Sequence, residues 1–418
     1  DKKYIICLIA IFYHNITKEN LKLCESNDKS LKGFVTGKKE KKKSKNYTRM
    51  DETLLIDTTI FLKNNKCEYE DSVTKSNKTV NDRKKVKLEE NSSNLSKKTS
   101  TIFSKHKTIT SVCLDDFEVK KVLGRGAISK VYLVRYEPTD EIFAMKALKK
   151  DVLLDKEKVE SAILEKKILQ TLEHPFLVGL IFCFQTEERI YFVMPFIKGG
   201  ELFQHLKKVN TFSEEEVKFY AACIGIALDY LHKNKILYRD IKPENILIDE
   251  DGYLKLIEFG LAKMLDKDTK TKTFCGTPEY VAPEIITGEG HSTPADWWSY
   301  GTLIYEMLFG VPPFYTENTK KMYHQILNTD FTFPKPAVLS EDAKDLIIKL
   351  LVKNQNARLG AKGGFEEIKK HRFFNGFNFN DLIDKKIKAP FTPEISGDFD
   401  VRNFDTEFTS EEVAQTAI

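Results

Sequence analysis

The sequence predicts an α+β protein with two lobes, a first lobe rich in β-strands and a second lobe that is helical. Short β-branched and aromatic runs follow one another over residues 117–196, including FEVKKVLG, KVYLVRY, EIFAMKAL and IYFVMPF, as strands require. After residue 200 the pattern becomes helical. Residues 217–232 are apolar on all sides, as in a buried helix, and Ser213 with Glu216 forms a capping-box start before them. A strand-rich part followed by a helix-rich part indicates two packed lobes with a cleft between them.

Length and composition exclude several classes of protein. The chain has 418 residues, of which 41% are hydrophobic and 31% charged, which is enough apolar material for about two to three domains. It contains no run of eighteen apolar residues, which argues against an ordinary membrane-spanning helix. Its seven cysteines include no Cys-x-x-Cys pair, which argues against a disulfide framework and a cysteine zinc site. We therefore expect a reducing compartment and a cytoplasmic protein.

Residues 1–112 form a basic arm in front of an acidic body. The arm carries 25 Lys and Arg against 14 Asp and Glu, whereas the rest of the chain carries 41 against 48. The arm is rich in Lys, Asn, Ser and Thr and has no sustained helix or strand period, so we expect a mostly disordered regulatory region. The acidic body argues against nucleic acid as the main partner and suits recognition of basic peptides.

The sequence leaves the role of the arm open between three interpretations. The arm is a solvated tail, it binds an anionic membrane surface through its Lys clusters, or it binds calmodulin through a basic amphipathic segment. The apolar run YIICLIAIFY (4–13) is either a local hydrophobic segment or a targeting signal. An arm that binds membranes would make this cytoplasmic protein peripheral at membranes.

A glycine-rich turn and a distant lysine are the first residues that indicate chemistry. Gly124 and Gly126 lie between two strand-like runs, where glycine lets the backbone approach phosphates closely, although this pattern alone is also typical of an ordinary turn. Lys146 lies in an alternating apolar strand and would need a charged partner if it were buried. Glu165, on the next helical run, can supply that charge. A solvated surface pair is the alternative for these two residues.

The segment LYRDIKPENILID (237–249) indicates a catalytic loop more strongly than any other. Asp240 is followed two residues later by Lys242 and five residues later by Asn245, between apolar flanks. Burying such a set is costly if it serves only as structure. Asp240 can orient a hydroxyl or accept its proton, Lys242 can offset phosphate charge, and Asn245 can hold a metal.

The remaining motifs follow in a recognisable order. Glu258-Phe-Gly260, KTFCGTPEYVAPE, NARLG and HRFF come after the catalytic loop, and with it they resemble the signature set of the protein kinases over residues 117–374. The details resemble the AGC group, and APFTPE with NFDTEFT makes residues 375–418 similar to the AGC C-terminal tail. The nearest likeness is to kinases of the protein kinase B (Akt) type, with the serum- and glucocorticoid-regulated kinases as near neighbours.

The resemblance implies a bilobal protein-kinase fold and a serine/threonine kinase that uses ATP with Mg²⁺, or Mn²⁺ in its place. The catalytic residues would be Asp240, Lys242, Lys146 and Glu165. The residues that bind ATP would come from the glycine-rich loop, the hinge and the catalytic loop: Leu123, Gly124, Arg125, Gly126, Ala127, Ile128, Ser129, Lys130, Val131, Lys146, Met194, Pro195, Ile197, Glu201, Glu244 and Asn245.

The same resemblance implies the metal ligands, the substrates and the mode of activation. Asn245 and Glu258 would bind the metal, and Glu201 with Glu244 would attract an Arg three residues before the target Ser or Thr of a protein substrate. Thr273 matches the activation-loop phosphosite, which an upstream kinase similar to the phosphoinositide-dependent kinases would phosphorylate. A phosphate there adds about −1.5 to −2 of charge, and Arg239 and Lys263 are placed to receive it. The alternative is a merely exposed threonine.

Some residues depart from the family pattern. The family has Asp where this chain has Glu258, and the extra methylene moves the carboxylate relative to a metal that demands near-octahedral geometry. The alternative function is therefore a low-activity, pseudokinase-like module that binds nucleotide. Ser129, Ile128 and Pro195 are milder departures. The Lys/Asn-rich composition of the arm is similar to inserts in AT-rich parasite genomes, including those of malaria parasites.

Overall fold

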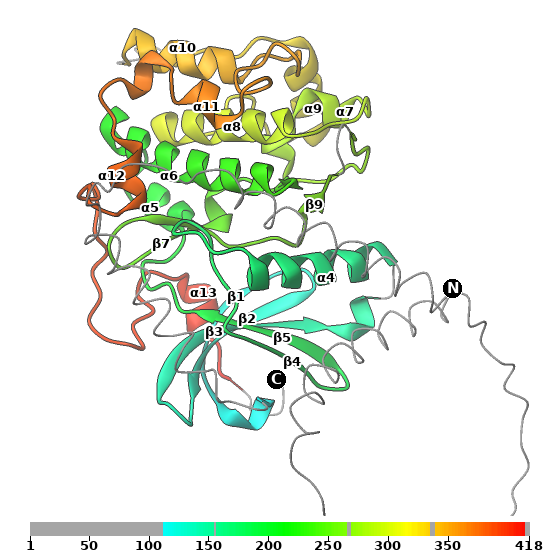
Figure 1. Ribbon diagram of the computed structural model, residues 1–418, viewed down its shortest axis with the longest axis vertical. Helices are drawn as coiled ribbons and strands as arrows, with labels where there is room; N and C mark the ends of the chain where they lie inside the picture. Colours follow the sequence, from blue (N-terminus) through cyan, green and yellow to red (C-terminus); the bar gives the residue numbers. More distant parts are fainter. Residues whose placement is uncertain (1–111, 154–155, 266–268, 335–338, 414–418) are drawn as a thin grey trace, which may run out of the picture. The chain divides into compact units, whose positions relative to one another are not determined.

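A computed structural model describes residues 112–153, 156–265, 269–334 and 339–413 (Figure 1). The basic arm and the apolar run 4–13 lie outside the described residues, so the interpretations of both stay predictions. Within the described ranges, none of the helices has the length and hydropathy that crossing a membrane would need.

The small lobe is one antiparallel sheet with strand order β1-β2-β3-β5-β4. The first three strands are consecutive and pair with their neighbours, with two register shifts between β1 and β2, and β5 pairs with both β3 and β4. Helix α4 lies along one face of the sheet in Figure 1. The elements of this lobe are η1 (Leu114–Asp116), β1 (Phe117–Arg125), β2 (Ser129–Tyr136), β3 (Glu141–Lys149), η2 (Lys150–Val152), α4 (Lys156–Thr171), β4 (Phe182–Gln185) and β5 (Arg189–Pro195).

Strand alternation divides β3 between two cores. Phe143, Met145 and Ala147 are buried in an aromatic cluster on one face of the sheet, where Phe117 and Phe184 stack with their ring centroids 5.5 Å apart. Because successive side chains of a strand point to opposite faces, Lys146 shares the other face with Leu148, which packs into the core that includes α4. The lysine is therefore directed toward α4 by the strand period.

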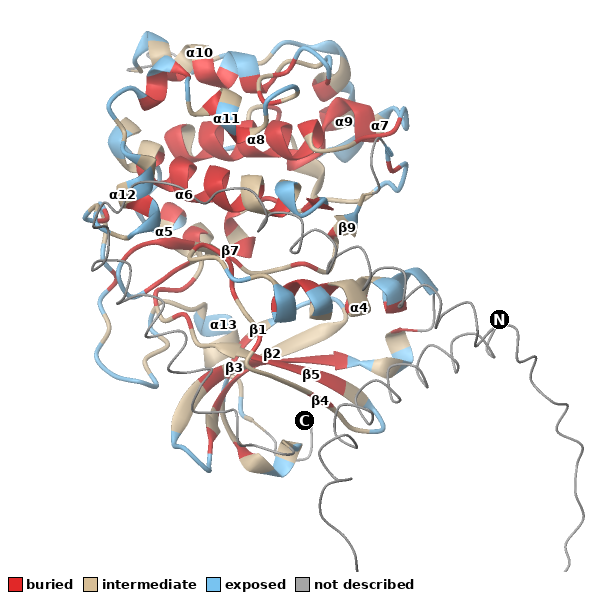
Figure 2. Ribbon diagram, in the orientation of Figure 1, coloured by how far each residue is buried: buried red, intermediate tan, exposed pale blue. Residues whose placement is uncertain are grey.

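The large lobe is helical and encloses α6 and α8 (Figure 2). Each of these two helices contributes more buried residues than any other described element of the lobe, including the adjacent Trp297 and Trp298, which are 0% exposed. The elements are α5 (Leu202–Val209), α6 (Glu214–Lys233), β6 (Ile236–Leu237), η3 (Pro243–Asn245), β7 (Ile246–Ile248), β8 (Leu254–Leu256), β9 (Lys263–Met264), η4 (Pro278–Tyr280), α7 (Pro283–Ile286), α8 (Pro294–Phe309), α9 (Thr319–Asn328), α10 (Glu341–Leu350), α11 (Phe365–Ile368), η5 (Arg372–Phe374) and α12 (Phe379–Ile383).

The expected start of the buried helix is confirmed. The Glu216 carboxylate accepts a hydrogen bond of 2.8 Å from the Ser213 backbone N–H, and the Ser213 hydroxyl accepts one of 3.3 Å from the Glu216 N–H. This capping box satisfies two donors that would otherwise lack partners at the first turn. A buried ion pair also stabilises the large lobe. The Arg358 guanidinium donates to both oxygens of the Glu284 carboxylate, at 2.7 and 2.9 Å, and both side chains are buried.

The C-terminal tail returns from the large lobe to the small one. The Phe391 ring stacks on His205 of α5 at a centroid distance of 3.9 Å, and the Phe404 ring stacks on Phe196 at 5.5 Å. The tail then forms α13 (Thr406–Thr409), which lies against β1 (Figure 1). Phe408 packs on the aromatic cluster of the small lobe. The tail thus contacts both lobes.

Candidate active site

The glycine-rich loop is a tight turn between β1 and β2. Gly124 pairs across the ladder with Val131, and the Gly126 N–H donates to the Ser129 carbonyl at 2.9 Å. A Cβ on Gly126 would come within 2.9 Å of the Ser129 hydroxyl, which would have to rotate away, whereas one on Gly124 would meet nothing within 4 Å. The backbone at Gly124 is therefore open to the approach of a ligand, as phosphate binding requires. Leu123 lies in β1.

Lys146 is buried between two carboxylates, so the alternative of a solvated surface pair with Glu165 is wrong. The Lys146 ammonium lies 2.6 Å from Glu165 Oε1 on α4 and 2.8 Å from Glu258 Oε2, and its side chain is 6% exposed. Burial by itself would lower the pKa of Lys146, but the two carboxylates outweigh it and raise that pKa above its ordinary value. The lysine thus stays charged, and it ties α4 to the segment after β8.

The catalytic loop and the activation segment are joined through Asp240. One Asp240 carboxylate oxygen accepts a 2.7 Å hydrogen bond from the Asn245 amide, and the other accepts one of 2.9 Å from the Thr277 hydroxyl. Lys242 donates to the same Thr277 hydroxyl at 3.0 Å. These bonds fix both carboxylate oxygens of Asp240. Thr277 lies in the run KTFCGTPEYVAPE, but its contact with the catalytic loop was not predicted from the sequence.

Asp296, at the start of α8, holds the backbone that precedes Asp240. Its buried carboxylate accepts hydrogen bonds from the Tyr238 N–H at 2.9 Å and the Arg239 N–H at 2.8 Å, and contacts His232 Nε2 at 2.7 Å. Arg239 has a φ of 69°, a left-handed conformation that costs free energy in a non-glycine residue. The two N–H contacts to Asp296 stabilise that turn.

The donor set of the cleft fits a divalent metal. Both side-chain hydrogen bonds that Asn245 makes with described residues use its amide nitrogen, so its amide oxygen is the atom that can bind a metal, together with the Glu258 carboxylate. In the described ranges, no group of three or more His, Cys, Asp or Glu could hold a metal ion. A small protein ligand set suits magnesium, which usually takes one or two protein ligands together with water and phosphate oxygens.

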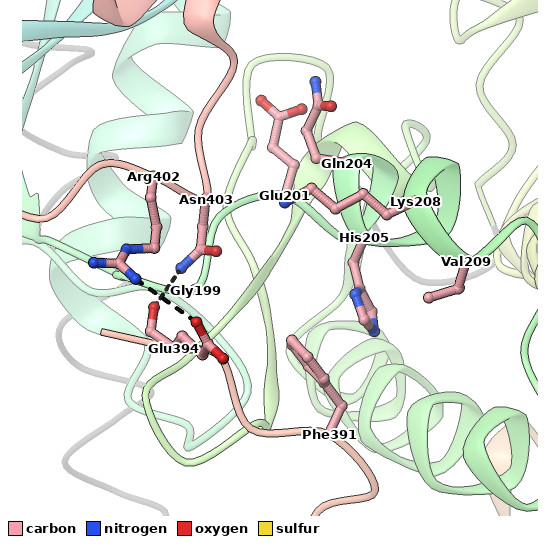
Figure 3. Close-up of a pocket in the computed structure, with 10 residues that line it drawn as sticks. All are labelled: Gly199, Glu201, Gln204, His205, Lys208, Val209, Phe391, Glu394, Arg402 and Asn403. Carbon is pink, nitrogen blue, oxygen red and sulfur yellow. Dashed lines mark hydrogen bonds and ion pairs between the residues drawn. The ribbon is translucent and has the colours of Figure 1, made fainter. Parts of the chain in front are cut away.

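The hinge connects β5 to α5. Met194 and Pro195 end β5, Ile197 is buried just beyond it, and Glu201 precedes α5. In Figure 3, Glu201 and Gln204 project together from the start of α5, away from the stacked rings of His205 and Phe391. A cavity of about 380 Å³ lies beside them, between α5 and the tail.

Carboxylates with raised pKa values cluster beside the catalytic loop. Burial, with the charges of Glu244 and Asp405, raises the pKa of Glu201 to about 7. Burial also raises the pKa of Glu244, and one Glu244 oxygen is buried without a hydrogen-bond partner among the described residues. Burial, with the charges of Glu244 and Glu279, raises the pKa of Glu306 to about 8. Such a cluster would be stabilised by a bound cation.

Thr273 is exposed on the activation segment, and Arg239 is the arginine expected to receive its phosphate. Arg239 donates through Nε to the Leu261 carbonyl at 2.6 Å, while its Nη1 is buried with no hydrogen-bond partner among the described residues. A buried guanidinium nitrogen without an acceptor costs free energy. This atom can therefore donate a hydrogen bond to an added anion without breaking another bond.

We expect Lys146→Met to destabilise the fold by about 3–5 kcal/mol at pH 8, because it leaves buried Glu165 beside Glu258 without a cation. The loss should be smaller at pH 5, since burial raises the pKa of Glu165 and lets it take up a proton in the folded variant. The unfolded carboxyl titrates near about 4.3, so the variant loses stability as pH rises above that value. Chemical denaturation at both pH values measures the difference.

The control for this experiment is Lys120→Met, which removes a lysine paired with Glu118 at the surface, where side chains are 29% and 37% exposed. It should cost less than about 1 kcal/mol at either pH. An equal loss at pH 5 and pH 8 for Lys146→Met would contradict the buried-carboxylate account.

Comparison with known proteins agrees with this geometry. Residues 117–374 match the protein kinase domain, and residues 395–418 match the protein kinase C terminal domain. The chain is 46% identical over 310 residues to protein kinase 2 of Dictyostelium discoideum, covering 74% of this chain and 64% of that protein. It is 47% identical over 300 residues to the serine/threonine-protein kinases Sgk1 of Gallus gallus and Homo sapiens, covering 71% of this chain and 69% of each.

These matches identify the chemistry of the cleft. Membership of the protein kinase family implies ATP and a divalent metal, which fits the open loop, Lys146 and the pair of Asn245 and Glu258. The low-activity alternative that Glu258 raised gains no support from these similarities. The chain belongs to the AGC group of the protein kinase family and is a serine/threonine protein kinase, a transferase.

Proposed function

We propose that this kinase transfers the γ-phosphoryl group of MgATP to Ser or Thr in substrates that carry Arg before the target residue. The observation that carries the proposal is the cluster of Glu201, Glu244 and Glu306 beside the catalytic loop. Burial is the main cause of each raised pKa, and the charge of Glu244 adds to it at Glu201 and Glu306, so a bound guanidinium would be attracted strongly by the ionised carboxylates. Arg is favoured over Lys because its planar fork can bind two carboxylates at once.

The catalytic loop supplies the groups that act on the substrate hydroxyl. Asp240, held by Asn245 and Thr277, orients the hydroxyl and accepts its proton on a carboxylate oxygen. Lys242, which lies 3.4 Å from Asp240 Oδ2, is placed to offset phosphate charge near that oxygen. ATP and its metal supply the phosphoryl group and neutralise its charge when bound. The protein contributes positioning and electrostatic stabilisation.

We assign the metal ligands to the Asn245 amide oxygen and the Glu258 carboxylate, with Mg²⁺ as the metal and Mn²⁺ as an alternative. The Glu258 carboxylate lies 2.8 Å from the Lys146 ammonium. Lys146 must then exchange part of this contact for the ATP phosphates when nucleotide binds. The longer carboxylate would hold the metal differently from an aspartate, and a misplacement of about 1 Å can cost roughly a hundredfold in rate.

Phosphorylation of Thr273 is the proposed activating event, by an upstream kinase of the phosphoinositide-dependent type. A phosphate there would add negative charge beside Arg239, whose Nη1 has no hydrogen-bond partner in the described part of the chain. Arg239 directly precedes Asp240 and contacts the activation segment through the Leu261 carbonyl. The phosphate would therefore order the activation segment against the catalytic loop.

The remaining proposals rest on features of the sequence. The protein is cytoplasmic. Its basic arm binds calmodulin, or it binds an anionic membrane surface and so keeps the kinase peripheral at the membrane. The Lys clusters of residues 1–112 support both interpretations of the arm. Likeness to the protein kinase B type rests on the tail motif NFDTEFT, and an origin in a malaria-type parasite rests on the Lys/Asn-rich composition of the arm.

The substrate proposal predicts a pH dependence that runs through Glu201. The pKa of Glu201 is about 7, so its carboxylate is mostly protonated at pH 6 and mostly ionised at pH 8. The KM for a peptide with Arg three residues before the target Ser should therefore fall by about fivefold or more over this range, as the ionised fraction rises. Steady-state kinetics on that peptide and on its Ala variant measure the change.

Two matched variants test this assignment. Glu201→Gln should flatten the pH dependence and raise the KM, whereas Glu250→Gln, at an exposed glutamate in the turn between β7 and β8, should leave both unchanged. The proposal fails if Glu201→Gln keeps the full pH dependence of the parent enzyme.

The activation proposal predicts that Thr273→Ala lowers kcat by about tenfold or more, equivalent to at least 1.36 kcal/mol of activation free energy, after treatment with the upstream kinase. Thr269→Ala, at an exposed threonine of the same segment, is the control and should respond like the parent. Mass spectrometry measures the phosphate on Thr273 in parallel. Full activity of a Thr273→Ala enzyme would contradict the proposed switch.

A further inference from the structure

The tail places one carboxylate between two cations of the glycine-rich loop. Glu411 Oε1 and Oε2 lie 3.1 and 3.0 Å from Arg125 Nη2, and Oε2 also lies 2.7 Å from Lys130 Nζ. Lys130 foremost, and then Arg125, lower the pKa of Glu411 below its usual range. A residue 286 positions away in sequence thus contacts both sides of the loop.

The two cations repel one another across the ladder. Arg125 and Lys130 are directly opposed in the antiparallel register of β1 and β2, and they form the last pair before the turn closed by Gly126 and Ser129. Like charges directly opposite in a sheet are destabilising. Without a shared anion, this repulsion would act at the base of the loop that covers the ATP phosphates. Glu411 supplies that anion.

The tail holds Glu411 in place through contacts that do not involve the loop. Phe408 packs on the aromatic cluster of the small lobe, and Lys121 donates to the Thr409 carbonyl at 3.4 Å. The Asp405 carboxylate accepts a 2.9 Å hydrogen bond from the Glu407 N–H and begins α13. The carboxylate is therefore presented by an anchored segment rather than by a free chain end.

We propose that Glu411 is a positioning residue for nucleotide binding, which holds the glycine-rich loop in its closed turn by neutralising Arg125 and Lys130. The inference rests on the ATP site and is independent of the proposed substrate class and of Thr273. The Arg125 side chain is 58% exposed and Glu411 26% exposed, so water and salt weaken the contacts and the effect is modest.

The experiment is a double-mutant cycle read by nucleotide affinity. We would measure the dissociation constant of the non-hydrolysable analogue AMP-PNP by calorimetry on the 418-residue chain, for the parent, Glu411→Gln, Arg125→Gln and the double variant. Glu411→Gln should weaken binding about threefold to fivefold, in line with one or two such charge pairs. The same substitution in the Arg125→Gln background should have a clearly smaller effect, because the repulsion has been removed.

Two further measurements separate positioning from general structure. Glu412→Gln, which removes the neighbouring exposed carboxylate, should leave the affinity unchanged, and the unfolding temperature of each variant without nucleotide should stay close to that of the parent. Hydrogen exchange of residues 124–131 should rise in Glu411→Gln alone. An unchanged affinity in Glu411→Gln, or an equal loss in both Arg125 backgrounds, would overturn the proposal. Failure of the parent to bind AMP-PNP would refute the ATP site itself.

Discussion

The structure depends first on one buried ammonium held between two carboxylates. Lys146 lies on the sheet, Glu165 on α4 and Glu258 on the segment after β8, and the contacts of 2.6 and 2.8 Å join all three. Removing a charge from water is expensive, and only close ionic partners offset that cost. Strand β3, helix α4 and the segment after β8 must therefore all be positioned so that these three side chains meet at one point. A cleft that can bind the phosphates of ATP follows from that arrangement.

A second set of contacts makes the catalytic loop rigid on the side of the large lobe. Asp296 at the start of α8 holds the backbone of Tyr238 and Arg239, and Thr277 of the activation segment holds Asp240. The base is thus oriented from a buried helix on one side and from the regulated segment on the other. This arrangement links any ordering of the activation segment to the geometry of Asp240. The tail adds a comparable constraint on the glycine-rich loop.

Much of the fold could be predicted from the sequence because its signals are local. The strand runs, the capping box of Ser213 and Glu216 and the all-apolar helix identify the two lobes, and the loop 237–249 carries its chemistry within a few residues. Lys146 and Glu165 were predicted to pair because a lysine on an apolar strand needs a charge. The structure adds that Glu258 shares this lysine, which spacing alone does not indicate.

The missed residues act over long sequence separations. Asp296 contacts backbone groups 57 and 58 positions away, and its carboxylate is one of many in the sequence until the fold is known. The contacts of Glu411 could not be predicted without knowing the register of β1 and β2, which places Arg125 opposite Lys130. The acidic cluster was predicted only in part: Glu201 and Glu244 were named from the resemblance, whereas Glu306 joins them through the position of α8. Tertiary packing, which no local pattern encodes, decides these contacts.

The most direct test of the account is phosphoryl transfer to an Arg-x-Arg-x-x-Ser peptide by the enzyme phosphorylated on Thr273. The rate would be measured in Mg²⁺ and in Mn²⁺, beside Glu258→Asp and Asp240→Asn. The account predicts transfer by the parent in at least one metal, within about a hundredfold of Glu258→Asp, and none by Asp240→Asn. A parent that is inactive in both metals, beside a vigorous Glu258→Asp enzyme, would contradict the claim that Glu258 serves as a working metal ligand.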